Sequence, residues 1–139
     1  MNSEEINTFF DVDEEPDARL RSLTNRIIGC AIRVHRALGP GYLESYYETA
    51  LQIEFERSGI AFVRQYPFEV RYEGQLVGEG RLDFLIEDLV IVELKHVESI
   101  ASIHVAQALS YLKATNKRLA LIINFNVPLL KNGIKRIAR

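Results

Sequence analysis

The chain has 139 residues, of which 47% are hydrophobic and 26% are charged, and its formal net charge at pH 7 is −2. This composition is typical of a soluble globular protein, and the single cysteine, Cys30, excludes a disulfide framework or a cysteine-based zinc site within one chain. No apolar run is long enough to span a membrane, so we expect a cytoplasmic protein with no membrane partner.

Charge is distributed unevenly along the chain. Residues 1–17 carry seven acids and no Lys or Arg, which leaves 17 basic against 12 acidic side chains in the remainder. We interpret residues 1–17 as an acidic, disordered arm and residues 18–139 as a single domain. The basic balance of that domain favours a polyanionic partner, and simple scatter of surface charge is the alternative explanation.

The first predicted elements are two helices. Apolar residues recur at spacings of three and four from about Ala18 to Leu38, and Gly39-Pro40-Gly41 ends this helix. A second helix is expected from about Tyr42 to Ser58, closed by Gly59. Glu44 lies in its first turn, where a carboxylate either complements the helix dipole or reaches a metal held elsewhere.

A strand region follows the helices. Ile60–Tyr66 and Phe68–Tyr72 are predicted as strand pieces separated by Pro67, which favours an edge or a bend. After a turn, the next strand begins near Gln75, and Gly78 and Gly80 indicate a bulge or a close backbone approach just before Asp83.

Residues 81–95 predict a hairpin whose side chains alternate between two faces. In the first strand, Leu82, Phe84 and Ile86 are expected on one face, with Asp83 and Leu85 on the other. In the second strand, Val90, Val92 and Leu94 are expected on one face, with Ile91, Glu93 and Lys95 on the other.

A turn near Glu87 and Asp88 would place Asp83 opposite or nearly opposite Glu93, with Cβ atoms about 5 Å apart. Two carboxylates at that separation repel unless a positive charge lies between them. Mg²⁺ or Mn²⁺ suits such oxygen ligands. The alternative is a solvated hairpin face with an ordinary Glu/Lys pair.

The last third of the chain predicts a helix, a buried strand and a basic tail. The helix runs from about Ile100 to Ala114 and carries a row of His104, Gln107 and Tyr111. This row is either plain polar surface or the neighbour of a phosphate or a metal-bound water. Residues 117–125 predict a strand covered on both faces, and residues 129–139 either a short helix or an extra strand.

Several stretches, in this order, resemble one known family. They are VHRALGPGYLESYYE, GRLDFLIEDLVIVELK, IHVAQALSYLK and LALIINFNVPLLKNGIKRI, and the first contains the spacing Gly41-Tyr42-Leu43-Glu44-Ser45-Tyr46-Tyr47. Over residues 20 to 137 the chain resembles the GxxExxY proteins, a bacterial and archaeal group placed in the PD-(D/E)XK nuclease superfamily. Leu82 stands at the position of the proline that names the superfamily, a proline that many members lack.

The resemblance implies an α/β fold with a restriction-endonuclease-like αβββαβ core, in which helices flank a mixed central sheet. It also implies metal ligation by Asp83 and Glu93, with the backbone carbonyl of Leu94 and the carboxylate of Glu44 as further ligands. Lys95 is expected to position or activate the attacking water, or to stabilise charge on the phosphate. The implied catalytic set is Lys95, Glu93, Asp83, Gln107 and Glu44.

The leading hypothesis is therefore a Mg²⁺-dependent nuclease, with Mn²⁺ as a substitute, that hydrolyses phosphodiester bonds of nucleic acid through a metal-activated water. DNA is the favoured substrate, and a homodimer is one arrangement in which so small a chain would act. One alternative is a nucleic-acid-binding or regulatory protein that keeps the fold without robust hydrolysis. Another is a metal-dependent site for a different phosphate-containing ligand.

Overall fold

Residues 18–139 are described in a computed structural model of the chain, and the predicted acidic arm, residues 1–17, lies outside the described residues. The elements, in chain order, are α2 (Ala18–Leu38), α3 (Glu44–Arg57), β1 (Phe62–Tyr72), β2 (Gln75–Ile86), β3 (Val90–Lys95), α4 (Ser102–Thr115), β4 (Leu119–Asn124), the 3-10 helix η2 (Leu130–Gly133) and β5 (Ile134–Ala138). Among these residues, no helix combines the length and apolar character that a bilayer span requires.

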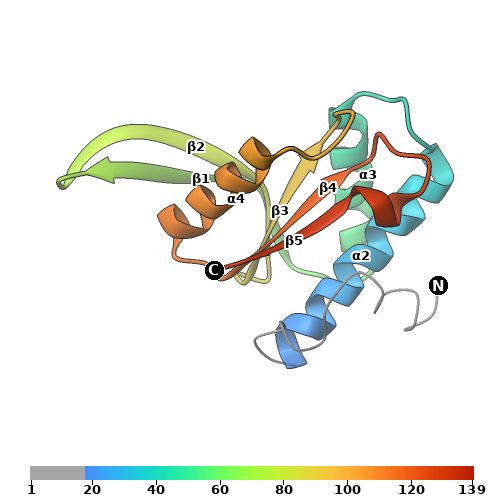
Figure 1. Cartoon of the computed structure of the whole chain (residues 1–139). Coiled ribbons are helices and arrows are strands. Elements are labelled where there is room, and N and C mark those ends of the chain that lie inside the picture. The colour runs from blue at the N-terminus through green and yellow to red at the C-terminus, as the bar shows by residue number, and fades with distance from the viewer. Residues whose placement is uncertain (1–17) are drawn as a thin grey trace.

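The five strands form one mixed sheet in the order β1-β2-β3-β4-β5. Neighbouring strands are antiparallel except β3 and β4, which are parallel and are joined through α4. The helices α2 and α3 lie on one side of the sheet and α4 lies on the other (Figure 1). The predicted restriction-endonuclease-like α/β fold is confirmed, and the basic tail forms both a short helix and an extra strand.

The core consists of two apolar layers, one on each face of the sheet. Val90, Val92 and Leu94 of β3 face α2 and α3, whereas Ile91 of the same strand faces α4. All six residues of β4 are buried, as expected for a strand covered on both faces. The alternation predicted for β3 is confirmed, so Glu93 and Lys95 lie in line with Ile91 on the α4 side.

The β1–β2 hairpin is longer than the sequence suggests. Pro67 does not divide β1, because β1 is an edge strand and its outer side needs no backbone N–H donor. Gly80 allows a close approach, since a Cβ built on it would lie 2.5 Å from the Phe68 ring. The predicted close approach before Asp83 is therefore confirmed at Gly80, whereas a Cβ on Gly78 would have no neighbour within 4 Å.

The predicted alternation around Asp83 is wrong. Leu82 packs in the layer facing α4, whereas Phe84 packs in the layer facing α2 and α3. The pairs Tyr66↔Leu82 and Arg64↔Phe84 flank this point, and between them Gln65 of β1 has a left-handed backbone with φ of 56°. Both strands thus exchange faces at the same position, where Asp83 lies.

Candidate active site

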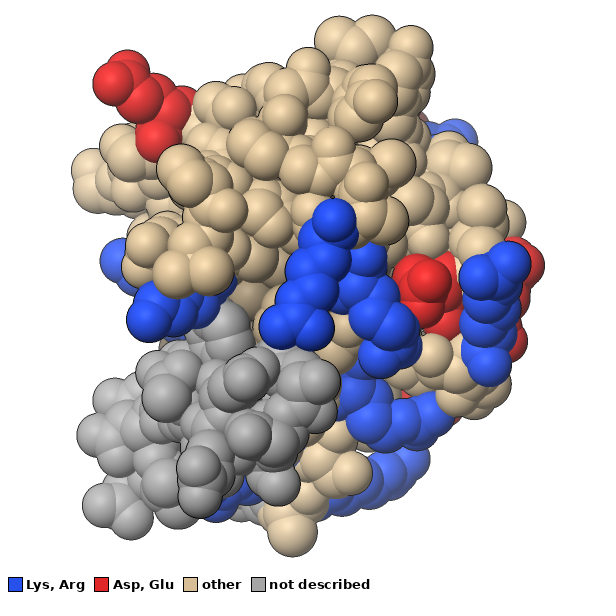
Figure 2. All heavy atoms as spheres, turned by 90° about the vertical axis from the view of Figure 1, so that its right-hand side faces the viewer, with Lys and Arg blue, Asp and Glu red and all other residues tan. Residues whose placement is uncertain are grey.

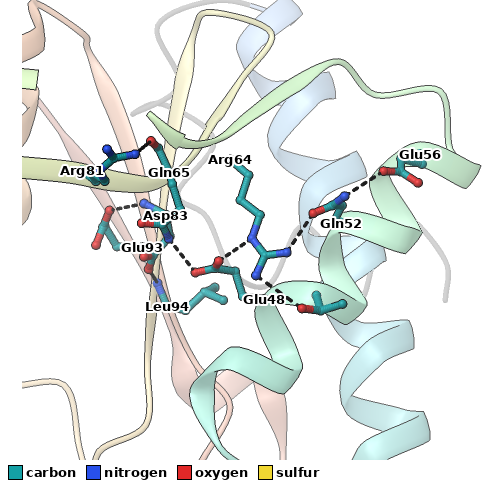
Figure 3. Close-up of polar contacts among 10 residues, drawn as sticks. Glu48, Gln52, Glu56, Arg64, Gln65, Arg81, Asp83, Glu93 and Leu94 are labelled. Atoms are coloured by element: carbon teal, nitrogen blue, oxygen red, sulfur yellow. Dashed lines mark hydrogen bonds and ion pairs between the residues drawn. The ribbon is translucent and has the colours of Figure 1, made fainter. Parts of the chain in front are cut away.

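The candidate site lies where β2 and β3 stop pairing as regular strands. The ladder between them ends at Phe84↔Val92. Beyond it, the backbone N–H of Asp83 donates to Oε1 of Glu93 at 2.9 Å, and the backbone N–H of Leu94 donates to Oδ2 of Asp83 at 2.7 Å (Figure 3). Each carboxylate is therefore held by the opposite strand, and the two converge between the strands.

Burial makes both carboxyls difficult to ionise. Glu93 is only 7% exposed, and this burial, together with the nearby charge of Asp83, raises its pKa to about 8. Burial also raises the pKa of Asp83, and the hydrogen bond from the Leu94 N–H opposes that rise. The positive charge of Lys95 lowers both pKa values, but not enough to return them to their ordinary range. The pair therefore carries uncompensated negative charge whenever both groups ionise.

Lys95, at the end of β3, lies beside this pair. Its ammonium donates to Oε1 of Gln107 on α4 at 3.0 Å. Its charge lowers the pKa of both Asp83 and Glu93, although in each case burial is the larger effect. The crossover helix therefore orients the lysine against the acids.

Only part of the predicted polar row on α4 faces the acids. Tyr111, one turn after Gln107, has a pKa raised first by burial and then by the charges of Glu93 and Asp83. His104 has a different partner, because its Nδ1 accepts the backbone N–H of Ala101 at 2.9 Å and caps the helix.

Glu44 is the first residue of α3 and lies near the acids without joining them. Its pKa is raised by burial and then by the charge of Asp83, and lowered by the charge of Lys95. Among residues 18–139, no three His, Cys, Asp or Glu side chains come close enough to form a metal-binding group. Of the predicted ligands, Asp83, Glu93 and the backbone of Leu94 are brought together, whereas Glu44 stands further off.

The loop before Glu44 is fixed by Tyr47, the last residue of the Gly41–Tyr47 motif. The Tyr47 hydroxyl donates to the carbonyl of Gly39 at 2.5 Å and accepts the N–H of Tyr42 at 3.2 Å. The Tyr47 ring is buried and stacks on Phe125 at 4.5 Å between centroids. The glutamate and tyrosine of this motif therefore differ in role: Tyr47 anchors the turn, and the charge of Glu44 interacts with Asp83 and Lys95.

Sequence reasoning missed a second polar group beside the acids. Glu48, one turn after Glu44, is buried and pairs with the guanidinium of Arg64, while Nε2 of Gln65 donates to its Oε1 at 3.0 Å (Figure 3). The charge of Glu48 raises the pKa of Asp83, and a hydrogen bond from Gln65 lowers it. The spacing of four between Glu44 and Glu48 was the available signal, because it puts both on one helix face.

Arginines gather on a different side of the molecule. Figure 2 views the right-hand side of Figure 1, where α2 and α3 lie, and shows many Lys and Arg side chains beside fewer acids. Arg21, Arg26, Arg33 and Arg36 of α2 line a hollow of about 800 Å³. Within it, Arg33 pairs with Glu54 at 2.9 Å and Arg26 donates to the carbonyl of Ser58 at 2.8 Å. These two arginines tie α2 to the end of α3.

The sequence model of the PD-(D/E)XK nuclease superfamily matches residues 21–137, which is most of the chain. The chain belongs to the PD-(D/E)XK nuclease superfamily. Membership indicates a nuclease whose substrate is nucleic acid, and members of the superfamily usually use divalent metal ions. None of the curated proteins gives a significant match to the chain.

Proposed function

We propose that this chain is a divalent-cation-dependent nuclease that hydrolyses phosphodiester bonds, with DNA as its favoured substrate and Mg²⁺ as its cation. The observation that carries the proposal is the converging pair of Asp83 and Glu93, held by reciprocal backbone hydrogen bonds beside Lys95. The Gly41–Tyr47 motif supports a finer placement among the GxxExxY proteins.

The donor set fits a hard divalent cation. Carboxylate and carbonyl oxygens are the ligands that such cations prefer, and Asp83, Glu93 and the carbonyl of Leu94 would hold it. Two buried acids with raised pKa values gain the most from a nearby cation, because it favours their ionised forms. When bound, a divalent cation lowers the pKa of a coordinated water and neutralises charge on the phosphate.

The remaining residues act on the substrate and on the acids. The ammonium of Lys95 is directed by Gln107, so that it offers a donor to a non-bridging phosphate oxygen or to the attacking water. The charge of Glu44 adds a further acid at the edge of the pair. Arg64 and Gln65 pair with the carboxylate of Glu48. This pairing keeps Glu48 from drawing the cation away from Asp83.

The test is cleavage of a panel of labelled single-stranded and duplex DNA and RNA, in Mg²⁺, in Mn²⁺ and in EDTA. Cleavage is expected only with a divalent cation, and the Asp83→Asn and Lys95→Ala variants are expected to lose it. Calorimetry of Mn²⁺ binding separates the two roles, because Asp83→Asn should lose cation binding while Lys95→Ala should keep it.

Cleavage that persists in both variants would mean another site or a contaminating enzyme. If the protein binds nucleic acid and cation but cleaves no substrate of the panel, the alternative of a nucleic-acid-binding protein that retains the nuclease fold is favoured instead.

A further inference from the structure

A groove lies between the β1–β2 hairpin and α4. The hairpin extends past the other strands, and α4 packs alongside β1 (Figure 1). The groove has a volume of about 1380 Å³. One wall is formed by β1 and β2 between residues 66 and 81, and the other by α4 and its C-terminal loop between residues 110 and 117.

Aromatic rings line both walls of this groove. Tyr66 and Phe68 come from β1 and Tyr111 comes from α4, and all three are half-buried. The rings of Phe68 and Tyr111 contact each other across the groove, with centroids 4.9 Å apart and planes tilted by 54°. Because Gly80 has no side chain, the Phe68 ring lies directly against the backbone of β2. The groove therefore offers partly exposed ring surface at a fixed position.

The charged residues of the groove are mostly basic. Arg71, Arg81, Lys113 and Lys117 line it, against Glu69 and Glu79. Arg71 pairs with Glu69 at 2.8 Å, and Lys117 pairs with Asp88 at 3.0 Å. Lys113 is exposed and has no ion pair among residues 18–139, and Arg81 donates to the backbone carbonyl of Gln65 at 3.4 Å. Arg81 and Lys113 thus keep their charges available to an anion.

Both walls of the groove are built from elements that also carry residues of the candidate active site. On β2, Arg81 precedes Asp83 by two residues. On α4, Tyr111 follows Gln107 by one turn, and its pKa responds to the charges of Glu93 and Asp83. A chain lying in the groove would therefore be directed toward the two acids.

We propose that this groove binds an unpaired strand of nucleic acid and leads it to Asp83 and Glu93. The inference rests on the proposed function and narrows its substrate to nucleic acid with a single-stranded segment. Bases in a duplex are stacked on each other, whereas the bases of a single strand are free to stack on aromatic side chains. Arg81 and Lys113 then meet the phosphates of the same strand.

The experiment measures binding without cleavage. The full chain carrying Glu93→Gln is titrated in EDTA against a fluorescent single strand of about 12 nucleotides, and separately against the same sequence as a duplex. We expect the single strand to bind more tightly. In this background, Lys113→Glu should weaken single-strand binding by about tenfold and reduce its salt dependence by about one phosphate contact. Tyr111→Leu should also weaken it by about tenfold through lost stacking.

The matched control is Arg57→Glu, which makes the same charge change at an exposed position. Arg57 ends α3, on the face of the sheet opposite α4. This variant should change single-strand affinity by less than about twofold. Lys113 is exposed, so its substitution leaves the core intact, and thermal unfolding of each variant confirms the fold.

Two results would overturn the inference: a duplex that binds as tightly as the single strand, or groove variants that bind as the Arg57→Glu control does. Failure of the proposed function gives a different result. Selective single-strand binding without any cleavage would remove the hydrolytic role but leave the groove assignment standing. Cleavage together with binding that the groove variants leave unchanged would support the hydrolytic role and remove the groove assignment.

Discussion

Two groups of acidic side chains lie side by side in this molecule, and they differ in the contacts that hold them. Glu48 is buried, but Arg64 and Gln65 satisfy it, and its pairing joins α3 to β1. Asp83 and Glu93 each accept a backbone N–H of the opposite strand, burial raises the pKa of both, and the charge of Asp83 adds to the rise at Glu93. Glu48 has the contacts of a structural ion pair, whereas the negative charge of Asp83 and Glu93 is not balanced by a positive charge. Buried carboxyl groups with raised pKa values are typical of functional sites.

The largest expected effect comes from Glu93→Gln. This change keeps the size of the side chain and removes the charge that the cation requires, so cleavage should fall by about 1000-fold. Rates of phosphodiester cleavage under saturating Mg²⁺ measure it. The protein should stay folded, because a neutral amide is easier to bury than a carboxylate. Retention of near-normal cleavage would mean that Glu93 has no place in the reaction.

The pH dependence of stability tests the same difference between the satisfied Glu48 and the pair of Asp83 and Glu93. Folding raises the pKa of Glu93 from 4.5 to about 8, so the folded chain holds its proton more tightly than the unfolded chain. Between those two values the cation-free protein should therefore lose stability as pH rises, by up to about 1.4 kcal/mol per pH unit. Urea unfolding in EDTA across this range measures the slope.

Glu93→Gln is the control for that slope. It should flatten the decline, because the titrating group is gone. A profile that is unchanged by the substitution would show that another group causes the decline.

Glu48→Gln should affect stability more than cleavage, which is the reverse of the effect expected from Glu93→Gln. Loss of the carboxylate leaves the Arg64 guanidinium partly buried without its charged partner, so the free energy of unfolding should fall by about 1–3 kcal/mol. Cleavage should fall by less than about tenfold, since Glu48 acts on Asp83 only through its charge. Urea unfolding and cleavage rates on the same preparation measure both quantities. A much larger loss of cleavage than of stability would place Glu48 among the catalytic acids.

An effect on cleavage alone is expected from Gln107→Ala. The amide orients the Lys95 ammonium from α4 but carries no charge, so cleavage should fall by about tenfold with no change in cation affinity. Steady-state cleavage and Mn²⁺ calorimetry measure the two. Gln107→Glu is a useful companion, because an added acid should replace the hydrogen bond to Lys95 by an ion pair and still slow the reaction. A change in Mn²⁺ affinity in Gln107→Ala would indicate that the amide helps to hold the cation itself.

The sequence by itself determined the order of the elements and the faces of β3. Its period of two puts Glu93 and Lys95 opposite Val92 and Leu94, because buried strands cannot rotate their apolar residues out of the core. The Gly41–Tyr47 motif and the acids of the hairpin were equally readable, since each depends on spacing within one short segment. These features are local, and local patterns are what a sequence states directly.

Only the tertiary structure decided how the acids are held. The exchange of faces between Leu82 and Phe84 depends on the left-handed backbone of Gln65 in a neighbouring strand, which no alternation in β2 encodes. The pairing of Glu48 with Arg64 and Gln65 joins residues 16 and 17 positions apart. The raised pKa of Glu93 likewise arises because strands and helices remove water from the carboxyl group together. Burial is a property of the assembled layers, so no single segment could have predicted it.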